Sequence, residues 1–163
     1  IRYGRLLKGR DIRDQFTTPS TEKLVIVGSE FALRVLAKPE VTEQLKAPKT
    51  FAESDLIPLT KRILFPVRFF FTAGTGEVGM NELAVEYYCQ NVDSPAAHLT
   101  QTALEWRSNP PQPGDPTTVS VLEEGLLPLC MVFLDDYEAR LRSYGQTDLA
   151  EQFREWKRNL TAD

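Results

Sequence analysis

The sequence predicts an all-α fold, organised as a single domain with a bundle of five to seven helices. Apolar residues recur at helical spacing along most of the chain, prolines and glycines separate these stretches, and no segment alternates in the manner of a strand. The 163 residues suffice for one ordinary domain, and the 42% hydrophobic content suffices for a core. We expect residues 17–163 to form this bundle, preceded by a basic N-terminal segment over residues 1–16.

The first helix is predicted to begin at Thr18-Pro19, because a capping hydroxyl before a proline is typical of a helix start. It should stop before Pro39, since proline disfavours helical backbone in the residue that precedes it. Its apolar stripe is predicted to be Leu24, Val27, Phe31 and Val35. Residues 40–46 can form a second, short helix that Pro48 bounds.

A long apolar helix is predicted next, from the start signal at Ser54-Asp55 through Phe71. Gly74 and Gly76 mark its end. Pro66 falls inside this helix, where it removes one backbone hydrogen bond.

Two shorter helices should follow. One covers roughly residues 80–90, and Ser94-Pro95 opens another that ends near Ser108. Residues 109–114 read NPPQPG, a composition that excludes regular structure and indicates a linker.

The longest helix is predicted to start at Asp115-Pro116 and to stop at Gly145. Its apolar stripe is Val119, Leu122, Leu126, Leu129 or Cys130, Phe133, Tyr137 and Leu141. Thr147 is expected to cap a final amphipathic helix, whose apolar face is Leu149, Phe153, Trp156 and Leu160.

Charge is distributed unevenly within a formal net charge of −4. Residues 1–68 carry 13 Lys/Arg against 8 Asp/Glu, whereas residues 69–163 carry 6 against 15. Within Phe69–Ala139 the only cation is Arg107, set against eleven carboxylates. Such a segment is either a site for a cationic ligand or a solvated acidic surface. The acidic balance argues against a general nucleic-acid binder.

The usual catalytic and metal-binding patterns do not occur in this sequence. His98 is the only histidine, and the chain has no phosphate-binding loop and no His/Cys cluster at metal-ligand spacing. The acid pairs Glu123-Glu124 and Asp135-Asp136 are adjacent in predicted helices, so they diverge by about 100° and are interpreted as solvated. We therefore predict no catalytic residue and no metal ligand in this chain.

Two cysteines, Cys89 and Cys130, are too few for a disulfide framework. Both have apolar neighbours, where a buried free thiol is the usual case. No apolar run reaches the roughly 18 residues needed to span a bilayer without a proline or a charge. These observations predict a cytoplasmic protein without a membrane partner.

Two segments carry a resemblance to a known family. The first, near the N-terminus, reads YGRLLKGRDIR, and the second starts at Arg68 and continues through TGEVGMNELAVEYY. The first resembles the end of the catalytic core of bacterial nucleotidyltransferases of the aminoglycoside adenylyltransferase type. The second resembles the main motif of the helical domain that follows that core, and residues 95–106 are similar to its next helix.

This resemblance implies a two-domain enzyme that transfers a nucleotide from ATP to a hydroxyl of a cationic, aminoglycoside-like molecule. Mg²⁺ and ATP would be held mainly by the enzyme's own N-terminal core, which the helical domain would close. Arg68 falls where the family has an arginine facing the nucleotide, and Glu77 and Glu82 are the candidate contacts to the cationic acceptor. Asn81 stands where the family commonly has a lysine.

No Gly-Ser followed by Asp-x-Asp, the metal-binding pattern of that core, occurs in the sequence. The chain is therefore expected to be inactive by itself and to represent the helical part of a longer protein. An alternative is a non-enzymatic interaction or homodimerisation module, with Phe69–Phe71 and Val119–Leu134 as its apolar contact surfaces. A third is a regulatory relative that binds nucleotide without transferring it.

Overall fold

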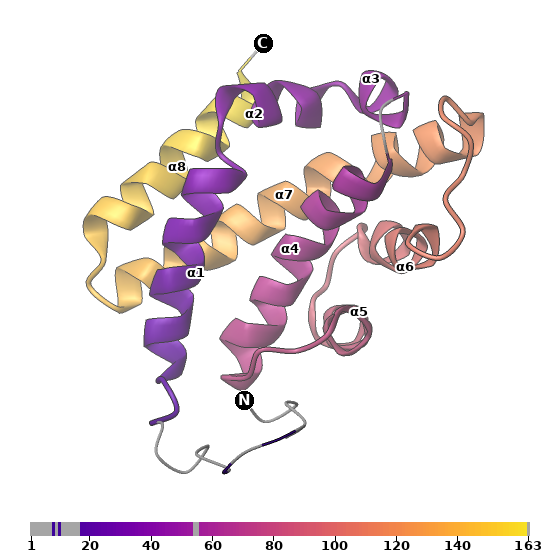
Figure 1. Ribbon diagram of the computed structural model, residues 1–163. Coiled ribbons are helices and arrows are strands. Elements are labelled where there is room, and N and C mark those ends of the chain that lie inside the picture. The colour runs from indigo at the N-terminus through magenta and orange to yellow at the C-terminus, as the bar shows by residue number, and fades with distance from the viewer. Residues whose placement is uncertain (1–7, 9, 11–16, 54–55, 163) are drawn as a thin grey trace.

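The computed structural model describes residues 8, 10, 17–53 and 56–162, and this part of the chain is all-α (Figure 1). Its eight helices are α1 (Thr21–Val35), α2 (Pro39–Lys46), α3 (Pro48–Ala52), α4 (Leu56–Thr75), α5 (Asn81–Asn91), α6 (Ala97–Trp106), α7 (Pro116–Ser143) and α8 (Thr147–Thr161). The all-α prediction is confirmed. The element that the sequence did not predict is the five-residue α3. The basic N-terminal segment, apart from Lys8 and Arg10, and the start signal at Ser54-Asp55 lie outside the described residues.

Helix α7 is the central element of the fold. It crosses the molecule diagonally behind α1 and α4 in Figure 1, and it contacts α1, α2, α3, α4, α6 and α8. Its start is confirmed, because the Asp115 carboxylate accepts hydrogen bonds from the Thr118 backbone N–H at 2.8 Å and from its hydroxyl at 3.0 Å. The predicted stripe is also confirmed from Leu122 to Leu141, while Val119 is half-buried.

By length and composition alone, α7 would be able to cross a membrane. The core helix of a soluble protein meets the same criteria, and α7 is the central helix of the packed bundle here. Its large apolar side chains pack against other helices of the bundle, with Leu127 at 40% exposure the exception that reaches solvent. The fold is compatible with a soluble protein.

An aromatic cluster centred on Phe133 joins α7 to its neighbours. Its ring centroid lies 4.7–6.2 Å from those of Phe69, Phe70, Tyr137, Phe153 and Trp156, which come from α4, α7 and α8. The predicted apolar face of α8 is confirmed for Phe153, Trp156 and Leu160, which are buried, while Leu149 is half-buried. Its predicted cap is wrong by one position, because Thr147 is the first helical residue and Gln146 is the N-cap.

The prediction for α1 is wrong at its start and in its stripe. Ser20, and not Thr18, caps the helix, with its Oγ accepting from the Lys23 N–H at 3.2 Å. Val27 is 54% exposed, and the fully buried residues are Val25, Ser29, Ala32 and Leu36. Small side chains allow α1 to approach the core closely, and the buried Ser29 hydroxyl is satisfied by the Val25 carbonyl at 2.8 Å.

The apolar segments expected to serve as partner surfaces contribute to the core instead. Phe70 and Phe71 are buried, Phe69 packs between α1 and α7, and the 119–134 stretch supplies the inner face of α7. Among the described residues, the large hydrophobic side chains classed as exposed are Val27, Val78, Met80 and Leu127.

Substitution Phe133→Ala should lower the free energy of unfolding by about 3–5 kcal/mol, because it leaves a cavity among several aromatic rings. Urea unfolding followed by circular dichroism measures this change. Leu127→Ala, on the exposed side of the same helix, is the matched control and should stay within about 0.5 kcal/mol of the parent protein. An equal loss of unfolding free energy in the two variants would contradict the assignment of Phe133 to the centre of the core.

Burial raises the pKa of the Cys130 thiol to about 12 from its ordinary 9.0. The folded state therefore keeps this proton after the unfolded chain has lost it. Stability contributed by the neutral thiol is present below pH 9 and falls as the pH rises from 9 towards 12, by about 4 kcal/mol at most. Unfolding free energies of the parent and of Cys130→Val, compared across this range, should diverge, with the variant less sensitive to alkali.

Candidate functional site

The corner between α4 and α5, residues 74–80, is the segment that the sequence singled out as a site. Helix α4 ends when Gly76 adopts a φ of +70° and donates its N–H to the Thr72 carbonyl at 2.9 Å. The Thr75 hydroxyl donates to the Phe71 carbonyl at 2.7 Å and accepts from the Glu77 N–H at 3.1 Å. The chain is thus turned by backbone groups that are largely satisfied within the corner.

The glycines of this corner are required by close packing. A Cβ at Gly79 would lie 2.6 Å from the Phe71 ring, and one at Gly76 would lie 2.7 Å from the Thr21 Oγ1 at the start of α1. The Phe71 ring meets Tyr87 of α5 edge-on at 5.8 Å. The corner is therefore held between α1 and α5.

Helix α7 fixes the last two turns of α4 from the other side. The Tyr137 hydroxyl donates to the Phe69 carbonyl at 3.0 Å, and the Arg140 Nη1 donates to the Ala73 carbonyl at 3.3 Å. Asp136 orients Arg140 through an ion pair of 2.7 Å. Burial raises the pKa of Tyr137 far above its ordinary value, so this donor keeps its proton at physiological pH.

The three predicted site residues lie on or near this corner without forming one contact set. Arg68 is half-buried on α4 and shares a helix face with Phe71 and Thr75, about 10 Å before the end of the helix. Glu77 is half-buried in the corner, and Glu82 is exposed in the first turn of α5. Arg68 and Glu82 make no ion pair within the part of the chain that the structure describes.

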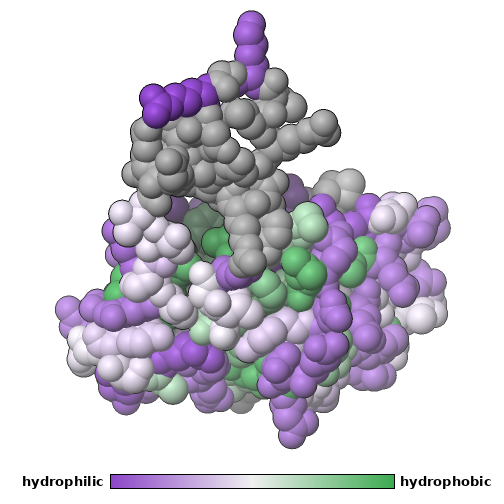
Figure 2. All heavy atoms as spheres, turned by 90° about the horizontal axis from the view of Figure 1, so that it is seen from below, coloured by the Kyte–Doolittle hydropathy of each residue, from purple (hydrophilic) through white to green (hydrophobic). Residues whose placement is uncertain are grey.

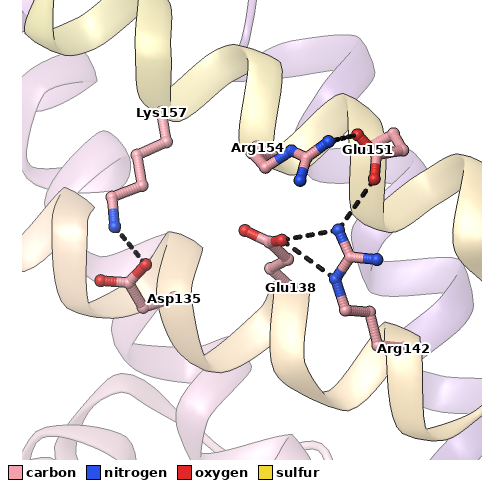
Figure 3. A network of polar contacts seen from close by, with 6 residues as sticks. All are labelled: Asp135, Glu138, Arg142, Glu151, Arg154 and Lys157. Atoms are coloured by element: carbon pink, nitrogen blue, oxygen red, sulfur yellow. Dashed lines mark hydrogen bonds and ion pairs between the residues drawn. The ribbon is translucent and has the colours of Figure 1, made fainter.

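Four of the eight carboxylates on α7 and α8 pair with cations of the same two helices, and Figure 3 shows three of them. The Arg142 Nη2 lies 2.9 Å from Glu138 and 2.8 Å from Glu151, and Arg154 also pairs with Glu151. Lys157 reaches across from α8 to pair with Asp135. The hydrogen bond from Arg142 is the main reason that the pKa of Glu151 is lowered. The Asp135-Asp136 pair, predicted to be solvated, has side chains that are 57% and 27% exposed, and each carboxylate also pairs with a cation.

Helices α5 and α6 lack such compensation. Four exposed carboxylates, which we call the α5–α6 acidic face, are Glu82, Glu86, Asp93 and Glu105. None of the four makes an ion pair with another described residue, and Arg107 is the only cation between residues 77 and 124. Seen from the end where α4 turns into α5, hydrophilic side chains spread over the right-hand side, where Figure 1 places α5 and α6 (Figure 2).

Other groups with chemical potential do not add to this surface. His98 is exposed on α6, and both cysteines are free thiols, Cys130 fully inside the core and Cys89 only half-buried. In the described ranges, no three His, Cys, Asp or Glu side chains are close enough to hold a metal ion.

Sequence reasoning named Glu77 and Glu82 but left out Glu86, Asp93 and Glu105. The spacing of Glu82 and Glu86, four residues apart on a predicted helix, indicates one shared face and was the available signal. The contribution of Glu105 from a second helix required the packing of α6 on α5. Comparisons with protein-family models, with curated proteins and with solved structures find no match to this chain.

Substitution Gly76→Ala should destabilise the protein more than Gly114→Ala. Both glycines have a positive φ, of +70° and +76°, but a Cβ at Gly114 meets nothing within 4 Å. Gly114→Ala should therefore cost about 1 kcal/mol, the strain of the backbone alone. Gly76→Ala should cost about 1 kcal/mol more, because of the Thr21 Oγ1.

Thermal or urea unfolding measures both losses. The double variant Thr21→Ala/Gly76→Ala should be compared with Thr21→Ala alone. The loss of unfolding free energy caused by Gly76→Ala should then be as small as that caused by Gly114→Ala. If the second substitution recovers nothing, the corner does not pack against α1 as described.

Proposed function

We propose that this chain is the helical, acceptor-binding domain of a cytoplasmic nucleotidyltransferase that resembles the aminoglycoside adenylyltransferases. Its role is to bind a cationic small molecule on the α5–α6 acidic face and to close over a separate catalytic core. The observation that carries the proposal is the set of exposed carboxylates on α5, α6 and the loop between them, none of which makes an ion pair with another described residue.

The acidic face has the electrostatics that a polyamine or amino sugar needs. Five carboxylates and one arginine between residues 77 and 107 create a negative potential that attracts cations and repels phosphate. Glu82 and Glu86 lie one turn apart on α5, and like charges at this spacing weaken a helix slightly. A bound ammonium group would relieve this repulsion, so the local cost is consistent with a binding role.

Arg68 and Glu77 take different roles in this proposal. Arg68, on α4, is assigned to a nucleotide triphosphate held by the core. Glu77, in the corner, is assigned with Glu82 to the acceptor. The described residues do not fit a bound Mg²⁺ ion, because they lack a cluster of three ligating side chains. The proposal assigns metal and ATP to the separate core.

Calorimetric titration with neomycin, an aminoglycoside carrying several amines, tests the acceptor role. We expect a Kd in the high micromolar range or weaker at about 20 mM salt, with binding lost at about 200 mM. The double variant Glu82→Gln/Glu86→Gln should raise the Kd about 3- to 10-fold, because two exposed charges are removed.

Glu30→Gln/Glu155→Gln is the matched control, since it removes two exposed carboxylates from α1 and α8. It should leave the Kd nearly unchanged, and a neutral sugar should give no heat. An equal loss of affinity for neomycin in both double variants would show that binding depends only on the net charge of the protein. No heat with neomycin at low salt would overturn the acceptor role.

The enzyme assignment has a separate test in the gene sequence that precedes the codon for Ile1. A nucleotidyltransferase core should appear there, with a Gly-Ser followed by an Asp-x-Asp within roughly the preceding hundred residues. An upstream reading frame that lacks this pattern contradicts the enzyme assignment, whatever the titration shows.

A further inference from the structure

A small cavity lies where α4, α7 and α8 meet the end of α1 and α2. The centre of a water molecule can occupy a volume of about 10 Å³ inside this cavity, which is enough room for a single water molecule. Most of its lining is apolar, including Cys130 and Phe133, but Arg62, Pro66 and Trp156 also border it. Of these three, Arg62 and Trp156 have polar groups, in a lining that is otherwise suited to hydrocarbon.

Trp156 contributes a buried hydrogen-bond donor. Its side chain is 4% exposed, and its Nε1 has no hydrogen-bond partner among the described residues. A buried N–H normally has a partner, because desolvation without one is costly. Trp156 is also held in position by the rings of Phe133 and Phe153, at 6.2 Å and 5.9 Å. It is not free to turn its N–H towards solvent.

Pro66, which lines the same cavity, leaves an acceptor in α4 without its helical donor. It lies inside α4 and has no backbone N–H, so the carbonyl of Arg62, four residues earlier, loses its usual helical donor. Both members of this interrupted pair line the cavity.

The guanidinium of Arg62 is engaged elsewhere. It lies over the Phe51 ring at 5.4 Å and donates to the Gln44 Oε1. The polar group of Arg62 that lacks a helical partner is therefore its carbonyl.

We propose that this cavity is a binding site for one ordered water molecule, which accepts a hydrogen bond from the Trp156 Nε1–H and donates one to the Arg62 carbonyl. The site takes a ligand of one heavy atom that both donates and accepts. The Cys130 thiol, a weak donor and acceptor, borders the same space and supplies a third contact. The water links α8 to the interrupted turn of α4. Among the described residues, no direct hydrogen bond joins these two helices.

Water–protein cross-relaxation in NMR tests for the molecule directly. The indole N–H of Trp156 should show a cross peak to water with the sign of a long-lived, protein-bound molecule. Trp106, the only other tryptophan, does not border the cavity and provides the control signal within the same sample. Absence of the cross peak at Trp156 would overturn the site.

A double-mutant cycle tests the second hydrogen bond. Trp156→Phe removes the donor, and Pro66→Ala supplies the missing N–H to the Arg62 carbonyl. If one water joins the two groups, their effects on the folding equilibrium constant should deviate from additivity by about 3- to 30-fold.

Pro128→Ala replaces a proline inside α7 that does not border the cavity, so its combination with Trp156→Phe should be additive. Urea unfolding provides each constant, and the cycle cancels effects of proline on the unfolded chain. If the effects of Trp156→Phe and Pro66→Ala are additive, the Arg62 carbonyl is not the second partner of the water. This conclusion would hold even if the cross peak at Trp156 is observed.

Discussion

Burial of the inner stripe of α7 is the interaction on which the rest of the fold depends. Phe133, at the middle of this stripe, contacts rings from both α4 and α8, so one side chain connects three helices. Each large apolar side chain removed from water contributes about 1.5–3 kcal/mol. Helix α5 attaches to this framework through α4, because Phe70 meets Tyr88 and Phe71 meets Tyr87, and α6 packs on both α4 and α7.

Polar contacts then determine where the corner lies. Two side chains of α7, Tyr137 and Arg140, donate to carbonyls in the last turns of α4, and Gly76 lies against Thr21. The first residues of α5 are thereby placed relative to both α7 and α1. The proposed acceptor surface is consequently supported by a rigid framework, although its own carboxylates extend into solvent.

The sequence was most informative where one physical signal dominated. The longest helix was predicted from Asp115 to its end because a capping carboxylate, a proline and a long apolar stripe all agree. The predicted buried face of α1 was wrong because Ser29 and Ala32 are buried there, and the small size of these side chains matters more than their hydrophobicity. Of the site, the corner was predictable from its glycines, but the pairing of Asp135 with Lys157 depends on the packing of α8 on α7. That pairing is a tertiary contact between residues 22 positions apart, which local patterns do not encode.

The uneven pairing of charge has a consequence for how the molecule meets other charged bodies. Four of the eight carboxylates on α7 and α8 pair with cations of the same helices, whereas residues 77–107 hold five carboxylates and one arginine, so uncompensated negative charge is concentrated around α5 and α6. Such an uneven distribution gives the protein a permanent electric dipole, which experiences a torque in an external field. An approaching polycation would therefore orient the domain before contact, with the α5–α6 end first. The association rate, and not only the affinity, would then depend on ionic strength.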